Sequence, residues 1–111
     1  MTRSKQSEEP VDAIAHVLRV DDGRWVLAGP LTIDNVADVL DASSEMALPE
    51  TGRIDLKGVD PVDSAGVALL LEWKRRASME RSAVVFANVP PGMASLAKLY
   101  GVDGLLSPSS S

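Results

Sequence analysis

The hydrophobic and polar positions in the first part of the chain predict a β-hairpin followed by a helix. Residues 16–20 and 25–28 are rich in strand-forming side chains, and Asp21-Asp22-Gly23-Arg24 between them contains Asp-Gly, a strong hairpin signal. The two strands are therefore expected to pair antiparallel. Apolar residues then recur at helical spacing over residues 33–46, and Thr32 is the expected N-cap of this helix.

The same patterns predict a second strand–helix unit in the middle of the chain. Residues 53–59 alternate between polar and apolar side chains, which predicts a half-buried strand with Ile54 and Leu56 facing inward. Residues 60–63 are expected to turn the chain. Helical spacing resumes over residues 64–79.

The last part of the chain predicts one buried strand and one more helix. Residues 83–87 form a continuous apolar run, which is typical of a strand covered on both faces. Pro91 suits the first turn of a helix, Gly101 suits its C-terminal stop, and residues 105–106 could add a short final strand. The order β-β-α-β-α-β-α, with an optional last β, predicts an α/β fold with a mixed sheet of about four to five strands and helices packed on it.

The length and the two ends of the chain define the expected domain. The 111 residues fit one domain, which we expect over residues 13–106. Residues 1–12 are polar and charged and are expected to be a disordered lead-in, and residues 107–111 are expected to be a flexible Ser/Pro tail. We expect no signal peptide, because the lead-in lacks an apolar region. The apolar run over residues 65–71 is far shorter than the roughly 20 residues of a membrane span.

Charge and composition narrow the possible functions. The formal net charge of -5 argues against nonspecific nucleic-acid binding, which needs many basic side chains. The chain has no cysteine, which excludes disulfides, thiolate nucleophiles and cysteine-based zinc sites. His16 is the only histidine, and the sequence shows no nucleophile motif, phosphate-binding loop or metal-binding motif. We therefore expect no enzymatic activity, no cofactor and no bound metal.

The turn into the second predicted helix is a candidate partner-binding site. It reads Asp63-Ser64-Ala65-Gly66, and Asp63 or Ser64 can accept hydrogen bonds from the first amides of the helix. Gly66 allows another backbone to approach closely. Together with Ala68, these small residues would leave a flat patch that can receive a helix or loop of a partner. The alternative is that they serve only capping and packing.

A neighbouring stripe on the same helix extends this candidate surface. Leu69, Glu72, Trp73 and Arg76 fall beside the core-facing positions. A partly exposed Trp73 would be a typical anchor of a protein interface, whereas the alternative is that Trp73 covers the edge of the core. The expected partner-binding residues are Asp63, Ser64, Ala65, Gly66, Ala68, Leu69, Glu72 and Trp73.

The element order and two motifs resemble the STAS domain, named for sulfate transporters and anti-sigma factor antagonists. The motifs are residues 29–32, Gly-Pro-Leu-Thr, and residues 63–66, Asp-Ser-Ala-Gly, and the resemblance covers about residues 14–106. Anti-sigma factor antagonists usually carry a hydroxyl residue at the position of Ala65. The turn as it stands here, and the stretch over residues 96–100, look more like the MlaB-like STAS subunits of bacterial Mla-type phospholipid-transport ABC systems.

The resemblance implies a non-catalytic accessory subunit. Such a subunit binds the cytoplasmic ATPase of the transporter and supports its assembly and activity, with the residue matching Ser64 in the contact region. The protein would be cytoplasmic and would reach the inner membrane only through this partner. Ser64 leaves an alternative open, an anti-sigma factor antagonist that binds an anti-sigma kinase and is switched by phosphorylation at Ser64.

Overall fold

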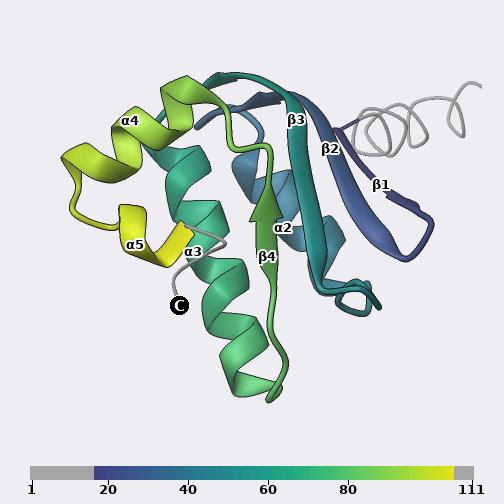
Figure 1. Cartoon of the computed structure of the whole chain (residues 1–111). Coiled ribbons are helices and arrows are strands. Elements are labelled where there is room, and N and C mark those ends of the chain that lie inside the picture. Colours follow the sequence, from purple (N-terminus) through teal and green to yellow (C-terminus); the bar gives the residue numbers. More distant parts are fainter. Residues whose placement is uncertain (1–16, 107–111) are drawn as a thin grey trace, which may run out of the picture.

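Strands and helices alternate after an initial hairpin in the computed structural model, which describes residues 17–106 (Figure 1). In chain order the elements are β1 (Leu18–Asp21), β2 (Arg24–Leu31), α2 (Val36–Ser44), β3 (Arg53–Val62), α3 (Ser64–Met79), β4 (Val85–Ala87), α4 (Pro91–Leu99) and α5 (Asp103–Leu106). The predicted α/β order is confirmed as far as α4. The expected lead-in, residues 1–12, and the expected tail, residues 107–111, lie outside the described residues.

The hairpin and two parallel pairings build one mixed sheet. In the hairpin, Leu18 of β1 lies opposite Leu27 of β2. Asp22 and Gly23 both have positive φ angles, 58° and 80°, which suit a two-residue turn that follows the twist of the strands. Strand β3 pairs parallel with β2, and β4 pairs parallel with β3, so the strand order is β1-β2-β3-β4.

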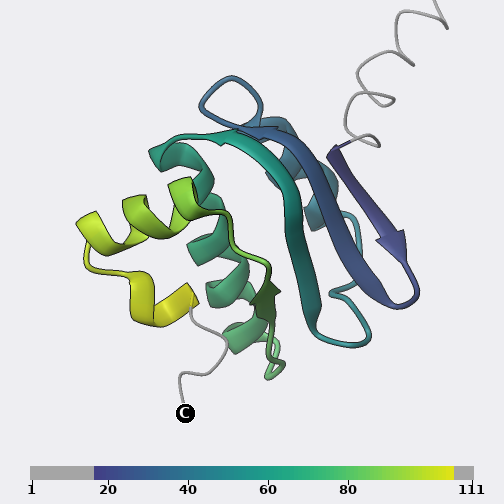
Figure 2. The ribbon, with the colours of Figure 1, turned by 45° about the horizontal axis from the view of Figure 1, so that its top comes forward.

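The helices cover one face of this sheet. Helices α2 and α3 lie side by side against that face, and α4 and α5 lie next to α3, beyond β4 (Figures 1 and 2). Four strand side chains that face the helices are fully buried, namely Trp25, Leu27, Ile54 and Leu56, so the inward direction predicted for the last two is confirmed. On the other face Arg19 points to solvent. The sheet therefore has one apolar face and one polar face.

The first helix is shorter than predicted, and Thr32 does not cap it. The N–H of Thr32 donates to Oδ1 of Asn35 over 3.0 Å, and the carbonyl of Thr32 accepts from the N–H of Val36 over 2.9 Å. Residues 32–35 therefore form a turn, and α2 begins at Val36 and ends at Ser44. Ile33 lies in this turn and is 76% exposed.

Three other expected boundaries are wrong for reasons of packing. Strand β3 continues to Val62, which pairs with Leu31, so residues 60–63 do not leave the sheet early. The strand expected over residues 83–87 begins only at Val85. It is not covered on both faces as expected: Val85 is 39% exposed, because helices cover only one face of this edge strand. Residues 105–106 belong to the helical turn α5, which buries Leu106.

Candidate functional site

Asp63 joins the turn before α3 to the loop before α2. Its Oδ1 accepts from the N–H of Ala65 over 2.8 Å, so Asp63, one of the two caps that the sequence allows, is the N-cap of α3. Its Oδ2 accepts from the N–H of Ile33 over 2.9 Å. The two oxygens of one carboxylate therefore fix two loops that lie 30 residues apart in the sequence.

Gly66 is buried and lets α3 approach β2. A Cβ atom at this position would lie 2.6 Å from the carbonyl oxygen of Leu31, which is far too close for any other residue. The close backbone approach predicted for Gly66 is thus made by a strand of this chain. Gly66 supports the turn from inside and offers no surface to a partner.

The exposed part of the turn is small and smooth. Ser64 and Ala68 are exposed, and Ala65 and Glu72 are half-buried. The backbone of Ile33 is bonded to Asp63, so this exposed side chain borders the same area. We call the area formed by Ile33, Ser64, Ala65 and Ala68 the Ser64 surface.

Leu69 and Trp73 do not belong to this surface, because both are 1% exposed. The indole Nε1 of Trp73 donates to Oγ of Ser43 on α2 over 2.9 Å, and its ring meets that of Trp25 edge-on with the centroids 5.3 Å apart. Of the two alternatives for Trp73, partial exposure is therefore wrong and the core position is correct, since the ring belongs to the contact between α2, α3 and the sheet. Periodicity alone did not reveal this, because the contact depends on a distant serine.

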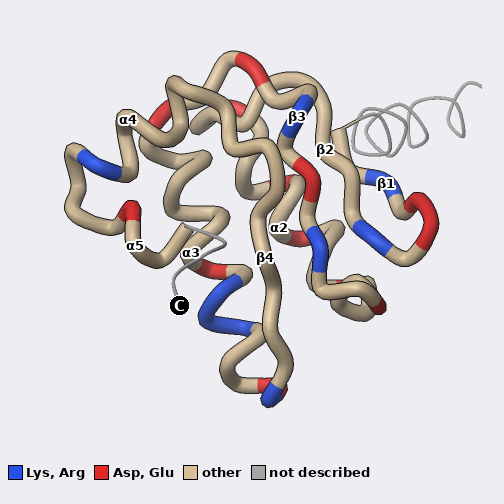
Figure 3. Tube along the Cα trace, viewed as in Figure 1, with Lys and Arg blue, Asp and Glu red and all other residues tan. Residues whose placement is uncertain are grey.

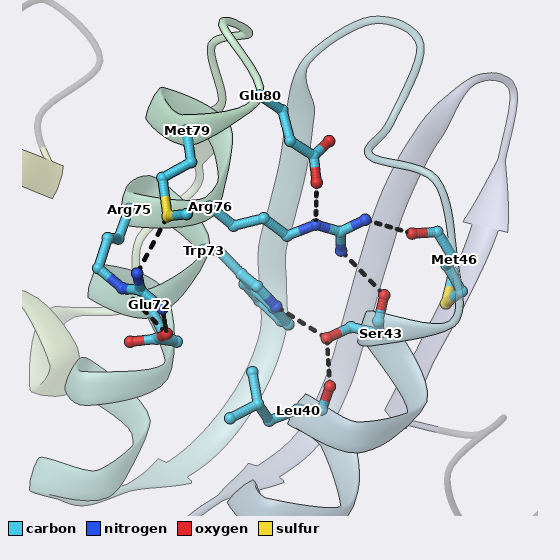
Figure 4. Close-up of polar contacts among 9 residues, drawn as sticks. All are labelled: Leu40, Ser43, Met46, Glu72, Trp73, Arg75, Arg76, Met79 and Glu80. Carbon is cyan, nitrogen blue, oxygen red and sulfur yellow. Dashed lines mark hydrogen bonds and ion pairs between the residues drawn. The ribbon is translucent and has the colours of Figure 1, made fainter.

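A groove lies between α2 and α3. It has a volume of about 530 Å³, and Trp73 and Leu40 lie at its base (Figure 4). Arg75 donates to the carboxylate of Glu72 along the α3 side, and this hydrogen bond lowers the pKa of Glu72. The sequence stripe of Glu72, Trp73 and Arg76 supplies part of one wall, but the opposite wall on α2 was not predicted, since it comes from a separate helix.

Arg76 lines the groove and joins α3 to the C-terminal end of α2. Its Nη1 donates to the carbonyl of Ser43 over 3.0 Å and its Nη2 to the carbonyl of Met46 over 2.6 Å, while its Nε donates to Glu80 over 2.8 Å (Figure 4). The guanidinium thus bonds to carbonyls at and just beyond the C-terminal end of α2, of which that of Ser43 also accepts from the N–H of Met46. Arg76 has a structural role that the sequence pattern did not show.

Asp55 lies on the open face of the sheet and stays ionised. Burial raises its pKa, but hydrogen bonds from Nδ2 of Asn88 over 3.0 Å and from the N–H of Lys57 over 2.9 Å, together with the charges of Arg24 and Arg53, lower the pKa by more. The net effect is a pKa below the ordinary value. A carboxylate held in this way is suited to accept hydrogen bonds rather than to exchange protons near neutral pH.

Residues 17–106 contain neither a metal-binding cluster nor a membrane-spanning helix. Within residues 17–106, no three His, Asp or Glu side chains are grouped so that they could hold a metal ion. None of the helices in this part of the chain combines the length and the apolar character needed to cross a membrane.

Comparison with known proteins gives one clear family. The sequence matches the family model described as "Mlab, STAS domain" over residues 12–107. No curated protein matches the chain significantly. A solved structure described as "Crystal Structure Analysis of Mglu" is similar in fold, with a TM-score of 0.51 and 24% sequence identity over 70% of this chain. The match spans only 21% of that protein, so it bears on the fold alone.

The family match includes every strand and helix described above, and it includes the Asp63 turn that fixes the start of α3. The fold agrees with it, since a mixed four-stranded sheet carries its helices on one face. The chain therefore belongs to the STAS-domain family, in its MlaB-like branch.

Proposed function

We propose that this protein is a non-catalytic subunit of a phospholipid-transport ABC system and binds the cytoplasmic ATPase of that system through the Ser64 surface. The observation that carries the proposal is the exposure of Ser64 and Ala68 at the start of a helix whose position Asp63 fixes. Membership of the MlaB-like branch supports the choice of partner.

The Ser64 surface is suited to a close contact with a second protein. The side chains of Ser64, Ala65 and Ala68 are short, so a helix or loop of the ATPase can approach the first turns of α3, and the exposed Ile33 beside them offers an apolar contact. The carboxylate of Asp63 holds Ala65 and Ile33 in place before binding, which keeps the entropic cost of docking low. Binding here would hold the ATPase in its assembled form, so that ATP hydrolysis by the partner is coupled to lipid movement.

Replacing Ser64 with arginine tests this contact. The chain would be co-expressed with the ATPase subunit of a phospholipid-transport ABC system. The amount of this ATPase that co-purifies with the chain would then be measured. We expect Ser64→Arg to reduce binding by about tenfold or more, because a long charged side chain would stand in the centre of the contact.

The matched control is Ser82→Arg, since Ser82 is an exposed serine just beyond the C-terminal end of α3, at the opposite end of the helix from Ser64. Ser82→Arg is expected to bind the ATPase as the unchanged chain does. Equal binding by both variants would refute the proposed contact, provided that circular dichroism shows both to be folded.

The exposure of Ser64 also favours a second candidate function, that of an anti-sigma factor antagonist. A hydroxyl at the first position of α3 is accessible to a kinase, and a phosphate there would meet the positive end of the helix dipole. Incubation with an anti-sigma kinase and ATP, followed by mass spectrometry, decides between the two functions. Unmodified Ser64 would rule out this second candidate.

A further inference from the structure

The groove between α2 and α3 is a separate surface from the one at Ser64. Ser64 and Glu72 are eight residues apart on α3, which corresponds to about 12 Å along the helix axis. The base of the groove is formed by the half-buried Leu40 and the buried Trp73. Met79 lies at the far end and is 71% exposed. The accessible apolar surface of the groove is therefore provided mainly by Leu40 on α2 and Met79 on α3.

The exposed side of α2, beside the groove, is negatively charged. Asp38 and Asp41 lie on α2 three residues apart, on its exposed side, and Asp34 and Glu45 lie just beyond its two ends. Acidic positions are red in the trace of Figure 3. All four side chains are exposed, and Asp41 lines the groove itself. Among the described residues none of them forms an ion pair, and α2 contains no Lys or Arg. We call these four residues the α2 acidic row.

The inner wall, on α3, is neutral by comparison. Arg75 is paired with Glu72, and Arg76 is paired with Glu80 and with two backbone carbonyls (Figure 4). The charges on this wall thus balance one another. The uncompensated negative charge lies on the α2 side of an apolar groove.

We propose that the groove receives an amphipathic helix of a partner protein, with apolar side chains over Leu40 and Trp73 and a row of Lys or Arg beside the α2 acidic row. A groove between two helices suits a third helix, whose anchors at every third or fourth residue follow the groove. The flexible thioether of Met79 can adapt to the side chain that enters. The proposal goes beyond the ATPase contact at Ser64 and does not depend on it.

The test uses the full chain and a synthetic helical peptide with leucines on one face and lysines along one flank. Binding is measured by fluorescence anisotropy of the labelled peptide and located by NMR. The indole N–H signal of Trp73 and the amide signals of α2 and α3 are expected to shift, while those of α4 stay unchanged. A peptide with glutamates in place of the lysines is expected to bind at least about tenfold more weakly.

Two variants separate charge from apolar contact. Asp38→Lys with Asp41→Lys should weaken binding of the lysine peptide by about tenfold, since two attractive contacts become repulsive. Met79→Ser should weaken it by about threefold and leave its dependence on salt unchanged. Glu50→Lys with Asp103→Lys changes the net charge by the same amount away from the groove and is the matched control.

The outcomes are distinct from those of the ATPase experiment. The Ser64→Arg chain is expected to bind the lysine peptide normally, so either proposal can fail alone. Equal binding of the two peptides, equal binding by the groove variant and its charge-matched control, or NMR shifts confined to another surface would each overturn the groove proposal. Shifts that appear only as the chain concentration rises would point to a second copy of this chain as the occupant and would also overturn it.

Discussion

At the scale of single residues, Asp63 has the clearest energetic role. Asp63→Ala removes the acceptor for the N–H groups of Ala65 and Ile33, and we expect a loss of about 1 to 2 kcal/mol in the free energy of unfolding. Asp63→Asn retains one amide oxygen as an acceptor, so it should lose less. Urea denaturation of the three chains measures this order. Equal stability of the alanine variant and the unchanged chain would contradict the role given to Asp63.

The bond between Trp73 and Ser43 is a second residue-scale prediction. Ser43→Ala leaves the indole N–H buried without an acceptor, and we expect this to cost about 1 to 3 kcal/mol. In a chain that already carries Trp73→Phe, the same change should cost much less, because the N–H is absent. A double-mutant cycle by denaturation measures the difference. Additive effects would show that the bond does not contribute.

At the scale of elements, the sequence predicted turns and helix caps most accurately, because these depend on residues that are close together in the chain. The Asp-Gly turn specified the hairpin, and the cap at Asp63 specified the start of α3. The start of α2 was missed because the side chain of Asn35 bonds back to Thr32 and Pro30 and so extends the turn. Sequence patterns show helical spacing, but they do not show which polar side chain competes with the helix for backbone partners.

The candidate site was predictable only in part, for the same reason. Asp63, Ser64 and Ala68 follow from a local turn, and the structure places them at the start of α3 as expected. The burial of Trp73 depends on Ser43, which lies 30 residues away. Contacts between two helices depend on how the helices pack, and a single sequence contains no direct record of that packing.

Arg76 couples α2 to α3, and its removal is the prediction at this scale. Arg76→Met keeps most of the aliphatic part of the side chain but removes the donors to the carbonyls of Ser43 and Met46. We expect a loss of about 1 to 2 kcal/mol in unfolding free energy. We also expect faster hydrogen exchange at the C-terminal end of α2, with α4 amides unchanged. Uniformly faster exchange in all helices would argue against a local role.

At the scale of the whole molecule, the one-sided packing of helices assigns separate roles to the two faces of the sheet. The covered face contains the core, and the solvent-facing side carries charged groups around Asp55. Both proposed contact surfaces lie on the helices, at the start of α3 and between α2 and α3. Charged side chains on the open face can therefore stabilise the fold without changing either contact surface.

The dependence of stability on pH tests this role of the open face. The pKa of Asp55 is lowered in the folded chain, so the folded state favours the ionised form more than the unfolded state does. The resulting stability is fully present above the unfolded value of about 4, and it is lost as the pH falls through the lower folded value. Asp55→Asn should thus be less stable than the unchanged chain at neutral pH, by about 1 kcal/mol. This difference should shrink below about pH 4 in urea denaturation series. A difference that stays constant from neutral to acidic pH would mean that the ionised form of Asp55 does not stabilise the sheet.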